Sequence, residues 1–170
     1  GENGEVRYTR HPLVYLVEAA DDICYEVMDI EDAHKLRILT TEEVIDLLTG
    51  FFDEERKEHM FRAMEFVDDP NEKVSYMRSC VIGTLVHQCA LAFVEHEEEI
   101  LRGEFKGSLL DHISPLEKNG YIRCSELSWE KIYRAGDVVD IELAGNQIIT
   151  FLMEKLIHAV RFPQLNYSTL

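Results

Sequence analysis

Apolar residues recur every three or four positions along much of the chain, which is the spacing of one face of an α-helix. The first such stripe predicts a helix from Pro12 to about Leu36, of roughly seven turns. Pro12 suits a first helical turn, because a proline there loses no backbone hydrogen bond. The apolar stripe consists of Leu13, Leu16, Val17, Ala20, Cys24, Val27 and Ile30.

Start and stop signals predict two shorter helices after this one. Thr40 and Glu43 have the spacing of a capping box, so a helix is expected over 41–48, with Gly50 as its stop. Another helix is expected to begin near Asp53. It should end before Asp69-Pro70, because the residue that precedes a proline resists helical backbone angles.

A long helix is predicted in the middle of the chain. Asn71 has the character of an N-cap, and Gly103 is the expected stop of the helix that Asn71 opens. The glycines and Pro115 between Lys106 and Gly120 predict a connecting region with about one helical turn.

Two more helices are predicted near the end of the chain. Ser125 is expected to cap a short helix that runs through Tyr133, and Asp137 is expected to cap a last, strongly apolar one. The two-residue alternation that is typical of half-buried strands is hard to find. We therefore predict an all-α fold.

The composition is that of a folded and acidic protein. The 17 Lys and Arg residues against 33 Asp and Glu residues leave a formal net charge of −16. Such a surface repels phosphate backbones and anionic membranes, which makes nucleic-acid binding an unfavoured function. With 170 residues, the chain is long enough to bury a core without disulfides.

Several features bear on the setting of the protein. The four cysteines contain no C-x-x-C pair, which favours reduced thiols in the cytoplasm. Polar residues interrupt the longest apolar run, Val81 to Val94, so no membrane-spanning segment is expected, and no secretory signal is recognisable. The chain begins at Gly1 and its first methionine is Met28, from which we expect a piece of a longer protein.

The first predicted helix carries many carboxylates on its polar side: Glu18, Asp21, Asp22, Glu26, Asp29, Glu31 and Asp32. An acidic helix face is most often a solvated surface, and the pattern alone favours that interpretation. The alternative is a site for a divalent cation, because hard ions recruit carboxylate oxygens. Asp21, Tyr25 and Asp29 are four residues apart, so they would stand above one another on one helix face.

The same region contains Arg10-His11-Pro12-Leu13, an E-A-A-D-D-I-C-Y stretch at 18–25 and D-I-E-D-A at 29–33. In these motifs the chain resembles the deoxyguanosine triphosphate triphosphohydrolases, a branch of the HD-domain phosphohydrolases. A weaker likeness follows in I-E-L-A-G at 141–145. The resemblance as a whole implies that the chain is the C-terminal helical part of an HD-domain-like fold. Residues 11–38 would be the last metal-ligand helix, and residues 39–170 would be a C-terminal helical subdomain.

The resemblance also implies roles for individual residues. In that family a metal is held by a histidine, a His-Asp dipeptide and a later aspartate, whose matching position here is Asp21. Asp22 is the alternative, and Asp21 is preferred because it directly follows the small residue Ala20. The family's tyrosine near the nucleotide sugar falls on Tyr25, and its aspartate near the sugar 3′-hydroxyl falls on Asp29. The implied metal is Mg²⁺ or Mn²⁺, and the implied substrate is a deoxynucleoside triphosphate such as dGTP.

None of the seven histidines is followed by Asp, so the family's His-Asp pair is missing from this sequence. The resemblance therefore implies that the chain keeps one metal ligand of four and part of the nucleotide pocket. We expect the chain by itself to bind metal poorly and to hydrolyse nothing.

Other candidate sites are supported by weaker sequence patterns. Glu31 and His34 have the Glu-x-x-His spacing of di-iron bundles, but no second such motif is present. The acidic run at 95–99 is most simply a solvated helix end. His87 and His158 are expected in the core or an interface, and the cysteines are expected as buried apolar residues. Arg78 is expected to pair with a carboxylate rather than to point into a nucleotide cleft.

A function of another class remains open: an acidic helical domain whose long amphipathic helices, 71–101 and 137–160, pair with another subunit. The two hypotheses are compatible, because members of the resembled family are commonly homo-oligomers. They differ in the surroundings of Asp21 and Asp29. If these two residues were tied into surface ion pairs with Lys35, Arg37 or Lys57, the nucleotide-site hypothesis would fail.

Overall fold

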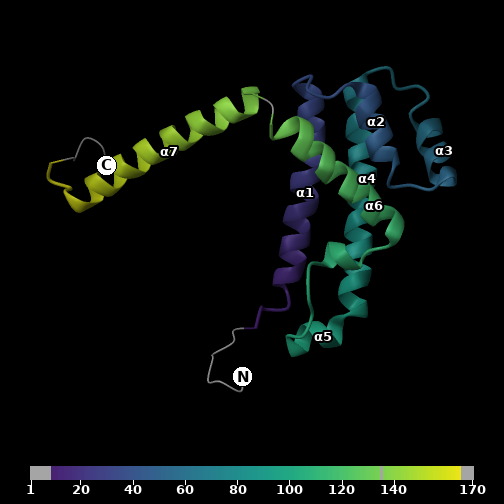
Figure 1. The fold of residues 1–170 in the computed structure, drawn as a ribbon, viewed down its shortest axis with the longest axis horizontal. Helices are drawn as coiled ribbons and strands as arrows, with labels where there is room; N and C mark the ends of the chain where they lie inside the picture. Colours follow the sequence, from purple (N-terminus) through teal and green to yellow (C-terminus); the bar gives the residue numbers. More distant parts are fainter. Residues whose placement is uncertain (1–8, 135, 166–170) are drawn as a thin grey trace.

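A computed structural model describes residues 9–134 and 136–165, apart from the side chain of Asp137 (Figure 1). Every regular element in these ranges is helical, which confirms the all-α prediction. In chain order the elements are α1 (Val14–Lys35), α2 (Thr41–Thr49), α3 (Glu54–Ala63), α4 (Pro70–Glu95), α5 (Glu97–Arg102), the 3₁₀ turn η1 (Leu109–His112), α6 (Pro115–Leu127), the π turn η2 (Ser128–Ile132) and α7 (Gly136–Arg161).

The core lies where α1 and α4 run side by side, with α2, α6 and η1 packed around them (Figure 1). Ile23, Ile30, Val74, Met77 and Leu85 are among the side chains that these two helices bury completely or almost completely. Of the apolar stripe predicted for the first helix, only Val27 and Ile30 are in the core, whereas Leu13, Leu16, Val17, Ala20 and Cys24 are exposed, so the predicted buried face is wrong over its first half. The core face of α1 carries Tyr15, Ala19 and Ile23 there instead. The predicted division of the chain between residues 38 and 39 falls in the turn after α1 and stays a prediction.

The capping box at the start of α2 is confirmed. The Thr40 hydroxyl accepts a hydrogen bond from the backbone N–H of Glu43, while the Glu43 carboxylate accepts one from the backbone N–H of Thr40. Both bonds satisfy backbone donors that have no partner inside a helix. The structure extends this helix by one residue, to Thr49.

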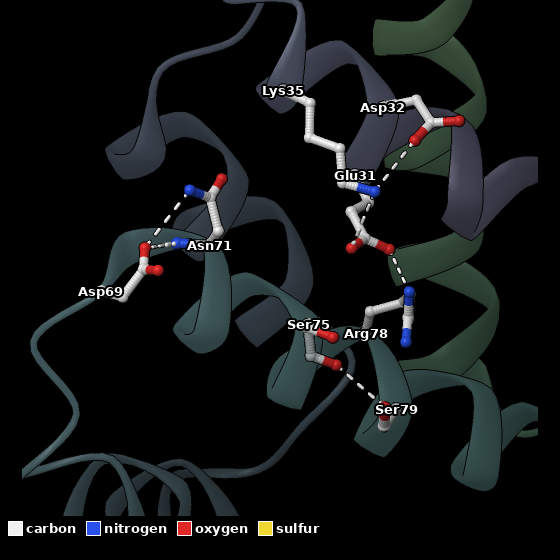
Figure 2. A network of polar contacts seen from close by, with 8 residues as sticks. All are labelled: Glu31, Asp32, Lys35, Asp69, Asn71, Ser75, Arg78 and Ser79. Carbon is white, nitrogen blue, oxygen red and sulfur yellow. Dashed lines mark hydrogen bonds and ion pairs between the residues drawn. The ribbon is translucent and has the colours of Figure 1, made fainter.

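α3 begins directly after its N-cap Asp53 and ends before Asp69-Pro70, as predicted. Its last residue is Ala63, because the N–H of Met64 is shared between the carbonyls of Met60 and Phe61 and the chain then leaves in tight turns. The start of the next helix differs from the prediction. α4 is capped by Asp69 and not by Asn71. The Asp69 carboxylate accepts from the Asn71 backbone N–H at 2.8 Å, and Pro70 occupies the first helical position (Figure 2).

The predicted single long helix to Gly103 is two helices, because α4 ends at Glu95 and α5 begins at Glu97. The sequence signal at Gly103 was nevertheless correct for the end of α5. Gly103 has a φ of 70°, a backbone conformation that favours glycine.

The connecting region predicted over 106–120 is wrong in its second half, since α6 begins at Pro115 and contains Gly120. A Cβ on Gly120 would lie 2.8 Å from the ring of the fully buried Phe51, so this glycine allows close packing and does not mark a turn. Ser125 is accordingly an exposed residue inside α6 and not a helix cap.

α7 runs away from the bundle in Figure 1 and exposes large apolar side chains along its length. The predicted capping role of Asp137 lies outside the described residues. The helix itself begins one residue earlier, at Gly136.

Within the described residues, α4 is long and apolar enough to cross a membrane by length and composition. Length and composition alone are weak evidence for a membrane span, so the expectation that no segment spans a membrane stays a prediction. The inner face of α4 is the centre of the bundle, where it packs against α1, α2 and η1. The core helix of a globular protein can meet the same criterion, although only 28% of this apolar window is buried.

Candidate functional site

Asp21, Tyr25 and Asp29 all lie on α1, which is continuously helical from Val14 to Lys35. The three residues therefore follow one another on one face, one turn apart, as their spacing predicted. Asp21 and Tyr25 are exposed, and Asp29 is half-buried. Asp22, the alternative metal ligand, is also exposed, and its pKa is raised by burial and by the neighbouring charge of Asp21.

The face of α1 that carries these residues also exposes apolar side chains. Leu13, Val17 and Met28 are 56%, 68% and 47% exposed, and Tyr25 is 60% exposed. These residues stand on the opposite side of the helix from Ile23 and Ile30, which are in the core. A helix that is apolar on both sides is usually covered on both sides. α1 thus presents an uncovered surface next to the three candidate residues.

Asp29 accepts a hydrogen bond from a residue outside α1. Tyr133 is the residue that follows η2, and its hydroxyl donates a 2.8 Å hydrogen bond to Oδ2 of Asp29. Burial raises the pKa of Asp29, against the effect of this hydrogen bond. The pKa of Tyr133 is also raised, first by burial and then by its hydrogen bond to Asp29.

Tyr133 also contacts the second candidate residue. Its ring stacks on that of Tyr25, with 6.2 Å between the ring centroids and 28° between the ring planes. Sequence reasoning used Tyr133 only as a helix end and missed this role. No sequence signal could have found it, because 104 residues separate Tyr133 from Asp29.

A buried contact fixes the segment that precedes Tyr133. Ser128, which is completely buried, donates a 2.9 Å hydrogen bond to the buried carboxylate of Glu26 on α1. The backbone N–H of Tyr133 in turn donates to the Ser128 carbonyl at 3.0 Å, closing the π turn η2. π turns inside helices frequently occur at functional sites.

Arg78 on α4 forms an ion pair with Glu31 on α1, and Lys35 approaches Glu31 at 3.2 Å and Asp32 at 3.2 Å (Figure 2). The expectation that Arg78 pairs with a carboxylate is confirmed. Asp29 takes no part in this network.

Asp21 also stands apart from the surface ion pairs. Among the described residues it makes no hydrogen bond or ion pair, and Lys57 pairs with Glu54. The surface network that would have counted against the nucleotide site is therefore not found in the described part of the chain. The roles of Asp21, Tyr25 and Asp29 stay predictions.

The described residues do not form a metal centre by themselves. No three His, Cys, Asp or Glu side chains in 9–134 and 136–165 are grouped so that they could hold a metal ion. Glu31 and His34, the Glu-x-x-His pair, are engaged elsewhere: Glu31 by Arg78, and the His34 Nε2 by the Thr41 hydroxyl at 2.9 Å. Asp21 alone is a single carboxylate, which is too few ligands for a stable site.

Other side chains differ from their expected places. His87 lies on the outer side of α4, where it is exposed and not in the core, and its alternative place in an interface stays a prediction. It lines a cavity of about 860 Å³ between α3 and α4, which contains none of the three candidate residues. Cys24 is exposed on the uncovered face of α1, whereas Cys89 and Cys124 are buried. Burial raises the pKa of these two thiols to about 11 and about 12.

No protein-family model matches the chain. Three curated relatives share the printed name deoxyguanosinetriphosphate triphosphohydrolase-like protein. The relative from Pseudomonas aeruginosa (strain LESB58) is 35% identical over 128 residues, which are 75% of this chain and 29% of the relative. The relative from Synechocystis is 30% identical over 155 residues, or 90% of this chain and 33% of the relative.

The relative from Listeria monocytogenes is 34% identical over 164 residues, which cover 89% of this chain and 34% of the relative. The chain spans about a third of the length of the curated relatives that it matches. By this similarity over most of its own length, the chain belongs with the deoxyguanosinetriphosphate triphosphohydrolase-like proteins, as a segment about a third as long as they are.

Proposed function

We propose that this chain is the C-terminal helical part of a deoxynucleoside triphosphate triphosphohydrolase and forms one wall of its nucleotide site. The reaction would convert a deoxynucleoside triphosphate such as dGTP, with water, into the deoxynucleoside and inorganic triphosphate. One observation carries the proposal. Asp21, Tyr25 and Asp29 stand in register on an uncovered face of α1, in a chain whose relatives bear the name of that activity.

Each of the three residues has a distinct role in this proposal. The Asp29 carboxylate would accept a hydrogen bond from the 3′-hydroxyl of the deoxyribose. The half-exposed Tyr25 ring would pack against the sugar. A buried acceptor left without its donor is costly, so such a contact would select substrates that carry the 3′-hydroxyl.

Asp21 would supply one carboxylate ligand to a divalent ion, Mg²⁺ or Mn²⁺. When bound, such an ion polarises a phosphoryl oxygen and lowers the pKa of water. The other ligands, a histidine and a His-Asp pair, would come from parts of the protein outside this chain. The 170-residue chain alone should therefore be inactive.

The uncovered face of α1 supports the proposal that the remaining metal ligands come from outside this chain. Leu13, Val17 and Met28 would be covered by the part of the protein that carries the remaining ligands. The relatives have room for such a part, because this chain matches only about a third of their length. The chain has a net charge of −16, so the positive charge that faces a triphosphate would also come from there.

The proposal is tested by measuring triphosphate release from dGTP and the other deoxynucleoside triphosphates, with Mg²⁺ or Mn²⁺. The complete gene product is assayed beside the 170-residue chain. Activity is expected only in the complete protein, and Asp21→Asn is expected to abolish it. Absence of activity in both proteins with every deoxynucleotide would refute the proposal.

Two matched variants sharpen the assay. Asp22→Asn removes the adjacent carboxylate, so a larger loss in Asp22→Asn than in Asp21→Asn would move the metal ligand to Asp22. Asp32→Asn removes an exposed carboxylate that pairs with Lys35 on the same helix, and it should leave the KM for dGTP unchanged. Asp29→Asn should raise that KM.

A second function is favoured by α7. Its apolar side chains Ile141, Ile148, Ile149, Phe151 and Val160 are each more than half exposed. Contiguous exposed apolar surface usually marks an interface, so we propose that α7 mediates association into homo-oligomers. Association through α7 is compatible with the proposed triphosphohydrolase function. We also propose that the protein is cytoplasmic and that its cysteines are reduced.

A further inference from the structure

We propose that Tyr133 is a positioning residue for the nucleotide site: it orients Asp29 and Tyr25 so that one Asp29 oxygen stays free for the substrate's 3′-hydroxyl. The inference rests on the proposed function and adds to it a residue outside α1. It is carried by two contacts from one side chain, a hydrogen bond to Asp29 and a ring contact with Tyr25.

The hydrogen bond leaves room for a ligand. Tyr133 donates to Oδ2 of Asp29 at 2.8 Å, and a carboxylate has about four acceptor positions over its two oxygens. Among the described residues no hydrogen bond to Oδ1 of Asp29 is found, so this oxygen can accept one from a ligand. Because Tyr133 holds the other oxygen, the carboxylate is fixed in rotation before any ligand arrives, which reduces the entropy lost on binding.

The ring contact fixes the second residue. Tyr25 is 60% exposed, and a side chain with that exposure would ordinarily sample several rotamers. Stacking on Tyr133 restricts it to one side of α1, next to Asp29. Tyr133 itself is only partly exposed, so it is held more firmly than the side chain that it contacts.

The position of Tyr133 depends on the π turn that precedes it. The extra residue in a π turn changes the direction in which the following side chains point. The turn is anchored at its first residue, where buried Ser128 donates to buried Glu26 on α1. The same helix therefore carries both the anchor, Glu26, and the residue that Tyr133 positions, Asp29.

The chemistry predicts a pH signature. A hydroxyl that donates to a carboxylate stabilises its charged form and lowers its pKa. For Asp29 this opposes the raising effect of burial. Removal of the Tyr133 hydroxyl should therefore raise the pKa of Asp29. As the pH falls, the carboxylate would then be protonated at a higher pH than in the wild type, and binding that needs its charge would be lost there.

The experiment compares Tyr133→Phe with the wild type in the complete gene product, with dGTP and 2′,3′-dideoxyguanosine triphosphate as substrates. We expect the KM for dGTP to rise about tenfold with kcat changed less than about twofold. The preference for dGTP over the dideoxy compound should fall, and the acidic limb of the pH profile of kcat/KM should move to higher pH. Tyr76→Phe, which removes a hydroxyl at the cavity between α3 and α4, should change none of these.

A double-mutant cycle with Asp29→Asn separates positioning from a direct contact with substrate. If Tyr133 acts through Asp29, the double variant should be no worse than Asp29→Asn alone. Additive effects on KM would overturn the positioning role, and so would an unchanged KM and selectivity in Tyr133→Phe. Inactivity of the wild-type protein would instead refute the proposed function itself, so the two failures are distinguishable.

The contact is also tested without activity. The pKa of the Asp29 carboxyl is measured by carbon NMR on the 170-residue chain and on its Tyr133→Phe and Tyr76→Phe variants. Only Tyr133→Phe should raise that pKa. An unchanged Asp29 pKa in a variant with native circular dichroism would overturn the inference, whatever the activity of the complete protein.

Discussion

Ser128 and Glu26 are 102 residues apart in the chain, yet the Ser128 hydroxyl donates a 2.9 Å hydrogen bond to Oε1 of Glu26 inside the core. Both side chains are buried, Ser128 completely. The bond ties the π turn after α6 to the middle of α1. It thereby connects the stability of the fold to the position of the candidate site.

The first prediction concerns this bond. Ser128→Ala leaves a buried carboxylate without its donor and should lower the free energy of unfolding by about 1–3 kcal/mol. Urea denaturation measures the change. Ser125→Ala, at an exposed position of α6, should change the unfolding free energy by less than about 0.5 kcal/mol. Equal effects of the two substitutions would contradict the structural role of the bond.

The second prediction is a pH dependence. Burial raises the pKa of Glu26, although the Ser128 hydrogen bond acts in the opposite direction. A carboxyl with a raised pKa in the folded state contributes stability at low pH, and this contribution is lost as the pH rises through the folded-state pKa. Glu26→Gln should therefore gain stability relative to the wild type as the pH rises from about 4 to about 8.

The control for this experiment is Glu126→Gln, which removes the same charge from an exposed position of α6. Its stability relative to the wild type should vary less with pH than that of Glu26→Gln. Urea unfolding at several pH values gives both curves. Parallel curves for the two variants would show that burial does not shift the Glu26 carboxyl.

The third prediction concerns the ion pair that joins α1 and α4. Glu31 is buried, and Arg78→Met leaves its carboxylate with only Lys35, which is half-exposed. The unfolding free energy should fall by about 1–3 kcal/mol. Arg62→Met breaks an exposed pair with Glu58 and should cost less than about 1 kcal/mol. If both variants lost the same stability, the buried pair would have no special role.

The fourth prediction uses the close approach of α6 to Phe51, which follows α2. Gly120→Ala places a methyl group 2.8 Å from the buried Phe51 ring and should destabilise the fold by about 1–3 kcal/mol. Gly145→Ala, in open space on α7, should instead be neutral or favour the helix by about 1 kcal/mol. Thermal unfolding of the two variants distinguishes them, and a stable Gly120→Ala protein would show that α6 does not pack as described.

The fifth prediction concerns α7. Ile148→Glu combined with Leu152→Glu should reduce self-association, because it places charges on an exposed apolar surface. The unfolding free energy of the monomer should change by less than about 0.5 kcal/mol. Sedimentation velocity and urea denaturation measure the two quantities. Gln147→Glu, which adds a charge at a polar position, is the control, and a large loss of stability would mean that α7 packs in its own core.

Local signals predicted the helices well where the relevant contacts lie within one turn. The capping box of Thr40 and Glu43 and the stop at Gly103 depend on residues up to four positions apart, so both were recognised. The same kind of signal failed at Gly120. A glycine that marks a turn and a glycine that admits a neighbouring ring look identical in sequence, and only the position of Phe51 tells them apart.

The candidate site shows the same limit. The register of Asp21, Tyr25 and Asp29 followed from helical spacing, because all three lie on one helix. Tyr133 could not be assigned to that site, since its place depends on how α6 crosses α1 and on one extra residue in the turn η2.

The sequence by itself determined that the chain is helical and that α1 carries Asp21, Tyr25 and Asp29 in register, but not which apolar face of α1 enters the core. These properties depend on spacing and on local hydrogen bonds. The tertiary structure alone decided which carboxylates are buried and which partners they have. Glu31 forms an ion pair with Arg78, Glu26 accepts a hydrogen bond from Ser128, and Asp29 accepts one from Tyr133. Such contacts join residues 47 to 104 positions apart, and helical periodicity carries no information about partners on other helices.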